Sequence, residues 1–440
     1  MQRHVRHNPP VFVYSPTKQR SKSQGAARRD DLRLHNTALI LRVLWAADEG
    51  AARIDLARNS GLSRATVSTI TAELMEQGLV VEGRQRASRG GRPAQILRFH
   101  DAWRSVVGIE MGASHISGVR TDLRGRVQQV RRVECNVQDD PNQALLTLGG
   151  MIRDLSSDLA FPILGIGLAV PSPMPMDGPG RLSPDLFPGW AHIDLKRWIH
   201  SEFGLPAFID NDANLGALAE HWWGSGRGLG DFAFVKVATG VGAGIIINGD
   251  IYRGAGGIAG EVGHTAIDPS GPTCRCGLQG CLEAFVGTQS LLRRAAEVAA
   301  TLSPRPDWAD SVTLPSLIHA ANAGDVAARE LIASAGHWLG IAVANLLNLI
   351  NPGRVILGGR LTRAGDLLLQ PLRKAVASRA LWSSVAETEI LISSLPDEPI
   401  ALGAATLVLQ AALSDPASIL LAGGSSALHT HQSTRWRQYA

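Results

Sequence analysis

The sequence is poor in the features that mark secreted and membrane proteins. It has only four cysteines in 440 residues, and few cysteines, three of them clustered, agree with a reducing cytoplasm rather than an oxidising compartment. The first thirty residues contain Arg, Lys, Pro and Ser and lack the apolar core of a signal peptide. We also expect no apolar run of the ~20 residues that span a bilayer. These absences predict a soluble, cytoplasmic protein with no membrane partner.

Length and charge distribution indicate more than one domain. A chain of 440 residues is too long for one small domain and predicts two or three. The net charge is only +4, but residues 1–100 contain 17 Lys and Arg against 8 Asp and Glu, a net charge of +9 that leaves −5 for the remainder. An N-terminal positive excess is expected where that end binds a polyanion, although a solvated basic surface would have the same composition.

Residues 31–100 have the pattern of a winged helix-turn-helix. Apolar positions at helical spacing predict a helix from Leu34 to Ala47 and a shorter one from Ile54 to Asn59. Ser63 is a good N-cap for a third helix that runs to Gln77. Small hydroxyls and an arginine on its exposed face suit the major groove of double-stranded DNA. The predicted DNA-binding residues of this helix are Arg64, Thr66, Ser68 and Thr69.

A basic loop is predicted between the two strands of a wing, Leu79–Glu82 and Gln95–Arg98. Arg89 and Arg92 flank two glycines there, in a loop that is flexible and narrow enough to enter a minor groove. The alternatives are a merely solvated helix or a protein-interaction module. Fold, charge and loop together favour DNA binding.

A second group of residues has the spacing of a metal site. His264 precedes Cys274, Cys276 and Cys281, so that three cysteines fall within eight residues. Three thiolates and one imidazole are a complete tetrahedral set for Zn²⁺ and leave no position for a catalytic water, which predicts a structural site. Buried cysteines or a disulfide are the alternatives, but the one-residue spacing of Cys274 and Cys276 disfavours a bridge between those two.

Several motifs accompany the cysteines in a fixed order: Asn211-Asp-Ala-Asn214, Gly254-Ala-Gly-Gly-Ile-Ala-Gly-Glu261, His264, and Cys274 through Glu283. Together they resemble the ROK family of bacterial sugar kinases and sugar-responsive repressors, over about 106–408. The resemblance implies an actin-like fold of the sugar kinase, heat-shock and actin superfamily, with two similar halves around a cleft. Strands alternating with helices favour the same α/β class.

These patterns predict four segments in the chain. We expect a disordered basic arm at 1–30, a winged helix-turn-helix with its linker at 31–100, a ROK sugar-binding domain at 101–414 and a disordered tail at 415–440.

The resemblance also implies a sugar pocket. Carboxylates accept hydrogen bonds from vicinal hydroxyls, and in the family's kinases the residue matching Asp212 is the general base. A zinc ion would fix the ring of His264 and the loop that carries Glu283. The alternative is that these polar groups only cap turns and helices. The expected sugar-binding residues are Asn211, Asp212, Glu261, His264 and Glu283.

The phosphate-binding turns of the family's kinases are only partly kept. The first turn matches residues 110–114, where Ala113 places a Cβ at a point that should approach a phosphate closely. The second, Ala238–Gly244, is better preserved. We therefore expect degraded nucleotide binding, involving Glu110, Gly112, Thr239, Gly240 and Gly242.

The favoured interpretation is a sugar-responsive transcriptional repressor of carbohydrate metabolism genes. It would bind operator DNA as a homodimer or homotetramer and need Zn²⁺, with no catalytic residue. The main alternative is a glucokinase-like or bifunctional enzyme with Asp212 as its base. A third is a metal-stabilised interaction protein without a small ligand.

Overall fold

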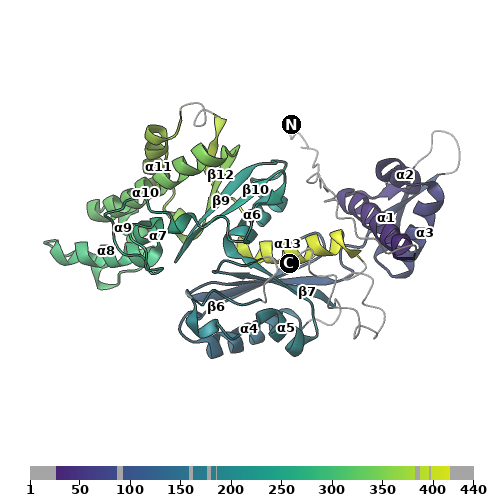
Figure 1. Cartoon of the computed structure of the whole chain (residues 1–440), viewed down its shortest axis with the longest axis horizontal. Coiled ribbons are helices and arrows are strands. Elements are labelled where there is room, and N and C mark those ends of the chain that lie inside the picture. Colours follow the sequence, from purple (N-terminus) through teal and green to yellow (C-terminus); the bar gives the residue numbers. More distant parts are fainter. Residues whose placement is uncertain are drawn as a thin grey trace.

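Three bodies make up the described part of the chain: a small helical unit and two larger lobes (Figure 1). The structure is a computed structural model and describes residues 26–86, 93–157, 162–175, 180–184, 186–381, 387–395 and 398–416. The predicted arm up to residue 25 and the predicted tail from 417 lie outside these residues.

The N-terminal unit is the predicted winged helix-turn-helix. Its elements are α1 (Ala26–Ala46), β1 (Ala51–Ala52), α2 (Arg53–Ser60), α3 (Arg64–Glu76), β2 (Val80–Arg86) and β3 (Ala94–Phe99), with the strands in the order β1-β3-β2. The Ser63 hydroxyl accepts the Thr66 N–H at 3.1 Å and caps α3 as predicted. Because α1 begins at Ala26, the expectation of a disordered arm is wrong for residues 26–30.

The first lobe is built on a five-stranded mixed sheet in the order β6-β5-β4-β7-β8. Helices α4 and α5 cover one face of this sheet and α13 lies on the other (Figure 1). Its elements are β4 (Ser105–Met111), β5 (His115–Thr121), β6 (Val127–Glu134), α4 (Pro141–Leu155), β7 (Ile163–Val170), η1 (Pro188–Trp190), α5 (Leu195–Phe203) and β8 (Ala207–Asn211).

The second lobe repeats the plan with a sheet in the order β11-β10-β9-β12-β13. Between the lobes runs α6 (Asp212–Trp223), which follows β8 directly. The remaining elements are β9 (Phe232–Val237), β10 (Val241–Ile247), β11 (Asp250–Ile251), η2 (Val262–His264), α7 (Leu282–Val286), α8 (Thr288–Thr301), η3 (Asp307–Asp310), α9 (Leu314–Ala323), α10 (Val326–Ile350), β12 (Arg354–Gly358), η4 (Arg360–Ala364), α11 (Asp366–Arg379), β13 (Glu389–Ile392) and α13 (Pro399–Ser414).

Helix α13 packs so closely on the first sheet that the two backbones are in contact. A Cβ built on Gly167 of β7 would lie 1.8 Å from the Ala404 carbonyl oxygen, so only glycine permits this approach. At its far end the Leu413 carbonyl accepts the Arg42 Nε–H at 3.1 Å. The same helix therefore touches the sheet of the first lobe and α1 of the N-terminal unit.

Helix α10 corrects the expectation about apolar runs. Its 25 residues are long and apolar enough to cross a membrane by length and composition alone. However, 67% of its most apolar window is buried inside the structure, where α10 packs along α11. This burial is typical of the core helix of a lobe.

Candidate functional site

All five residues expected to bind sugar line one cleft between the lobes. Asn211 ends β8, Asp212 begins α6, Glu261 precedes η2, His264 ends η2, and Glu283 lies on α7. The cleft also includes four of the five expected nucleotide residues, Gly112, Thr239, Gly240 and Gly242. Residues from both lobes, up to 171 positions apart in the chain, thus meet at one place.

Asn211 serves mainly to position α6. Its Oδ1 accepts the N–H groups of Ala213 at 2.9 Å and Asn214 at 3.3 Å, which makes it the N-cap of the helix. Its Nδ2 donates to the Ser172 carbonyl at 3.2 Å, which leaves one amide N–H for a ligand. The cap fixes where the adjacent Asp212 enters the cleft.

The floor of the cleft contains a buried ion-pair triad that the sequence analysis missed. Lys236 of β9 donates to Asp212 Oδ2 at 2.6 Å and to Glu110 Oε1 at 3.1 Å. All three side chains are at most 10% exposed. Glu110 belongs to the first lobe and Lys236 to the second, so the triad joins the two lobes across the cleft. The one signal in the sequence is a lysine inside the otherwise apolar strand Phe232–Val237.

Lys236 favours the charged form of both carboxylates, against the effect of burial. Burial alone would raise the pKa of Glu110, but Lys236 and His115 lower it to about 2. Burial would lower the pKa of Lys236, yet the two carboxylates raise it above its ordinary value. Burial also raises the pKa of Asp212 against the pull of Lys236. We treat Asp212 as ionised, because the 2.6 Å contact is the length of a charge-assisted hydrogen bond.

Glu283 is fixed from two sides. Its Oε1 accepts Arg275 Nε–H at 2.6 Å, and its Oε2 accepts the Val241 N–H at 3.0 Å. Arg275 stands between two of the clustered cysteines, so the cysteine loop holds this carboxylate directly. The Val241 amide lies in the expected second phosphate loop, and its N–H already donates to Glu283.

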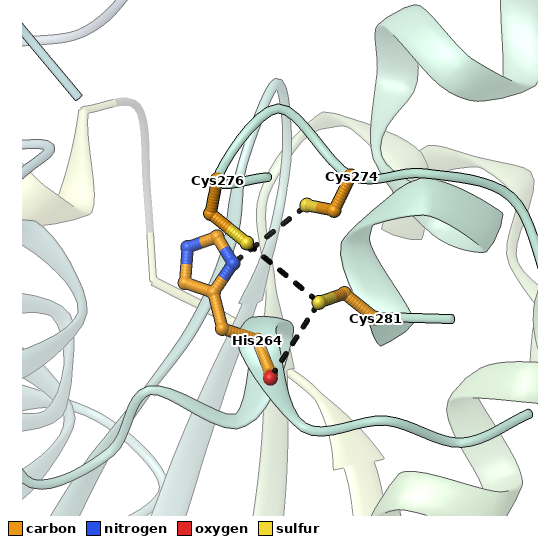
Figure 2. A group of neighbouring side chains, drawn as sticks. All are labelled: His264, Cys274, Cys276 and Cys281. Atoms are coloured by element: carbon orange, nitrogen blue, oxygen red, sulfur yellow. Dashed lines mark hydrogen bonds between the residues drawn. The ribbon is translucent and has the colours of Figure 1, made fainter. Parts of the chain in front are cut away.

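His264 and the three cysteines converge as Figure 2 shows. Their ligand atoms all lie within 4.8 Å of one another. The Sγ atoms of Cys276 and Cys281 are 3.8 Å apart, and Cys274 Sγ is 3.8 Å from His264 Nδ1. A tetrahedron with Zn–S bonds of 2.3 Å has edges of ~3.8 Å. The donor set and its spacing therefore fit a four-coordinate zinc ion, while Nε2 of His264 stays free for the cleft.

The turn expected to match the first phosphate turn, residues 110–114, is covered by a side chain of the protein itself. A Cβ built on Gly112 would lie 2.5 Å from His115 Cε1, so the imidazole rests on the backbone where a phosphate would have to approach. His115 Nε2 also lies 3.7 Å from Glu110 Oε2. This cover adds to the obstacle expected from Ala113.

The cleft is narrow, and it contains a carboxyl group with a raised pKa. Burial, with Asp212 and Glu283 nearby, raises the pKa of Glu261 to about 7. The free volume of the cleft is about 60 Å³, well below the roughly 300–1,000 Å³ typical of ligand pockets. A ligand of the usual size would need the lobes or the lining side chains to move apart.

The predicted DNA-binding residues of α3 differ in exposure. Arg64, Ser68 and Thr69 are exposed. Thr66 is half-buried, and its hydroxyl shares a 2.8 Å hydrogen bond with Ser63, so it is partly committed to the helix cap. Arg89 and Arg92 lie outside the described residues.

Two regions of the chain match known protein families. Residues 106–411 match the ROK family and residues 34–83 match the IclR helix-turn-helix domain. The xylose repressor of Caldicellulosiruptor bescii is 33% identical over 87% of this chain and 97% of its own length.

Two solved structures share the fold. A ROK family transcriptional regulator, described as a homologue of the E. coli MLC protein, superposes with a TM-score of 0.74 at 26% identity, over 89% of this chain and 98% of its own. A ROK family glucokinase from Streptomyces griseus, solved with glucose and AMPPNP, gives 0.62 at 27% identity over 70% of this chain and 99% of its own. A helix-turn-helix followed by an actin-like two-lobed domain, together with these matches, shows that the chain belongs to the ROK family.

Proposed function

We propose that this protein is a sugar-responsive DNA-binding repressor of carbohydrate metabolism genes. The observation that carries the proposal is that one chain contains both an exposed DNA-recognition helix, α3, and a cleft in which Lys236 holds Asp212. The C. bescii relative named as a xylose repressor aligns over 97% of its length and 87% of this chain. Because helix-turn-helix proteins usually read paired half-sites, we propose that it acts as a dimer or a dimer of dimers on operator DNA.

The charges in the cleft favour a neutral sugar as the effector. Both cations that the structure describes in the cleft lining are already paired, Lys236 with two carboxylates and Arg275 with Glu283. A sugar phosphate would therefore find no unpaired cation there, whereas hydroxyls find carboxylate oxygens that accept hydrogen bonds. D-Xylose, D-glucose and N-acetyl-D-glucosamine form the test panel.

We propose zinc as the resident metal at His264 and the three cysteines. It would hold His264 and the loop that carries Arg275, and Arg275 in turn fixes Glu283. The metal is thus a support for two sugar-binding residues rather than a participant in chemistry.

Separate variants should divide DNA reading from sugar sensing. Arg64→Ala should weaken binding to a duplex selected from a random library with the full-length protein, by roughly 1–3 kcal/mol if the arginine contacts a base edge. Asp212→Ala should retain affinity for that duplex without sugar and lose the response to every sugar of the panel. Gel-shift titrations with and without each sugar measure both effects.

The matched control for the first variant is Arg293→Ala, an exposed arginine on α8 in the far lobe, which should leave DNA affinity unchanged. A fully sugar-responsive Asp212→Ala protein, or undiminished binding by Arg64→Ala, would contradict this division of roles.

The second candidate function is a ROK-type hexose kinase, favoured by the likeness to the S. griseus glucokinase and by the retained Asp212. A base that lies 2.6 Å from a buried ammonium is poorly placed to take a proton from a hydroxyl. The imidazole on Gly112 and the engaged Val241 amide also disfavour nucleotide phosphates. The geometry therefore supports sensing over phosphotransfer.

We expect no significant phosphotransfer from ATP and Mg²⁺ to any sugar of the panel. A coupled assay for ADP release should stay far below the ~1–100 s⁻¹ of typical kinases. Turnover in that range, abolished by Asp212→Asn, would establish the kinase instead.

A further inference from the structure

Helix α6 reaches from the sugar cleft to the DNA-binding unit. Its first residue, Asp212, lines the cleft, and its last two, Trp222 and Trp223, meet Trp45 of α1. Twelve residues at a rise of 1.5 Å make a helix of about 18 Å. Every residue from 212 to 222 is buried. A helix packed along its whole length moves as one body, so its two ends are mechanically linked.

Trp45 brings the DNA-binding unit into contact with this helix. Its ring centroid lies 5.2 Å from that of Trp222 and 6.1 Å from that of Trp223, both edge to face. Its indole N–H donates to the Leu123 carbonyl at 2.8 Å. The side chain is only 6% exposed, and it belongs to the last turn of α1.

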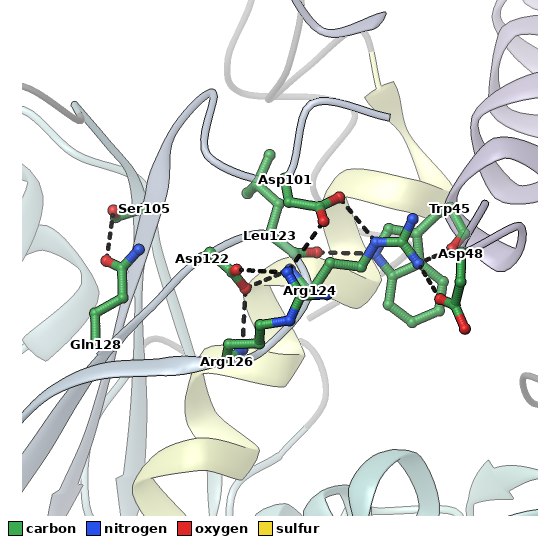
Figure 3. Close-up of polar contacts among 9 residues, drawn as sticks. All are labelled: Trp45, Asp48, Asp101, Ser105, Asp122, Leu123, Arg124, Arg126 and Gln128. Carbon is green, nitrogen blue, oxygen red and sulfur yellow. Dashed lines mark hydrogen bonds and ion pairs between the residues drawn. The ribbon is translucent and has the colours of Figure 1, made fainter. Parts of the chain in front are cut away.

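The turn between β5 and β6 fills the space between α1 and α6. Arg124 donates from Nη1 to the Trp45 carbonyl at 2.6 Å and to Asp48 at 2.9 Å, and from Nε to Asp101 at 2.9 Å (Figure 3). The neighbouring Gly125 has φ +70°, and a Cβ there would lie 2.4 Å from the Trp223 ring. The turn is therefore held against both helices.

Helix α13 supplies a second connection between the same two partners. The Trp223 indole N–H donates to Thr406 Oγ1 at 2.8 Å, and the Leu413 carbonyl accepts from Arg42 of α1 at 3.1 Å. The end of α6 is thus tied to α1 directly through Trp45 and indirectly through α13.

We propose that α6 transmits the state of the sugar cleft to the DNA-binding unit through Trp45, an inference that rests on the proposed function. A sugar hydroxyl on Asp212 competes with Lys236 for the carboxylate, and the cleft must widen to admit the ring. Movement of Asp212 then displaces Trp222 and Trp223 at the other end of the helix. Because Trp45 packs against both rings, α1 turns with them, and the recognition helix α3 changes its orientation.

The test measures coupling rather than binding. In full-length Trp45→Phe and Arg124→Gln proteins, affinity for the selected duplex is determined by fluorescence anisotropy with and without D-xylose, D-glucose or N-acetyl-D-glucosamine. In the wild type the sugar should change DNA affinity by about 5- to 150-fold. Each variant should lower that factor by about threefold or more. By linkage, the duplex should change the sugar affinity of each protein by the same factor by which the sugar changes its DNA affinity. Calorimetry with and without the duplex should therefore show the same reduction in the two variants.

The control is Trp198→Phe on α5, a half-buried tryptophan in edge contact with Phe203 and away from α1, which should leave the factor unchanged. Sugar affinity without DNA should also stay within about twofold in all three variants, because none of these residues lines the cleft. A merely structural role would lower the melting temperature and leave the factor intact.

Two outcomes separate this inference from the function on which it rests. If the wild type responds to none of the sugars, both fail. If the wild type responds and the Trp45→Phe and Arg124→Gln proteins respond by the same factor, only the inference about α6 is overturned.

Discussion

Replacing Lys236 with methionine should destabilise the protein by roughly 3–5 kcal/mol and abolish sugar binding. The change leaves Glu110 and Asp212 buried without their cation, and removing one partner of a buried ion pair costs about this much. Thermal melts with and without each sugar measure both effects. Asp212→Ala differs in charge, because Lys236 then keeps Glu110 as its partner and the pair is neutral, so that variant should lose less stability than Lys236→Met.

The stability of the Lys236→Met protein should depend on pH, and the pKa shifts give the sign. In the wild type the folded-state pKa of Glu110 is about 2, below its ordinary 4.5, so its contribution is present above about pH 4.5 and is lost as pH falls toward 2. Without Lys236 the two carboxylates have pKa values raised by burial and mutual repulsion. Stability is then highest in acid and is lost as pH rises.

We therefore expect the Lys236→Met protein to melt higher at pH 5.5 than at pH 8. Lys374→Met, at an exposed lysine of α11, is the matched control and should follow the wild type. Parallel melting curves for Lys236→Met and wild type across this pH range would show that the triad does not carry the charge balance described here.

Cys276→Ser should remove most of the zinc and weaken sugar binding by at least about tenfold. A structural zinc site needs four ligands. Changing a residue that supports a metal site typically lowers metal affinity or activity 10–100-fold, and we expect a loss of sugar affinity of similar size here. Elemental analysis should give about one zinc per wild-type chain and clearly less in the variant. Calorimetry with the sugar that binds the wild type measures the second effect.

Cys135→Ser is the control for this experiment. Cys135 is half-buried against the core of the first lobe and lies apart from the cluster, so zinc content and sugar affinity should both be retained. Wild-type protein that contains no zinc would remove the metal proposal, whereas unchanged sugar affinity in zinc-free Cys276→Ser would remove only the supporting role of the loop.

Local patterns carried most of what the sequence could predict. The N-cap at Ser63 and the spacing of His264 and the cysteines are set by residues close together in the chain, and the structure has both as predicted. The helical start at Ala26 was missed because a basic, polar composition was interpreted as disorder.

The long-range contacts could not be predicted in the same way. Lys236 meets Asp212 from 24 positions away and Glu110 from 126, so no local pattern joins them. The same is true of Trp45, which is separated by more than 170 positions from the pair of tryptophans at the end of α6. These side chains meet only because elements that are far apart in the chain pack together, the two lobes in one case and α1 against α6 in the other. A charge inside an apolar strand and two adjacent tryptophans were the available signals.

The position of α13 in the chain has a consequence for the order of synthesis. This helix is made after every strand that it covers, and the backbone contact at Gly167 cannot form until residues 399–414 have left the ribosome. The N-terminal unit is made before both lobes, and its buried residues continue into the cluster that the first sheet, α6 and α13 complete. During translation it therefore precedes the surface that orients it, and it reaches its docked position only when the ligand-binding lobes are complete.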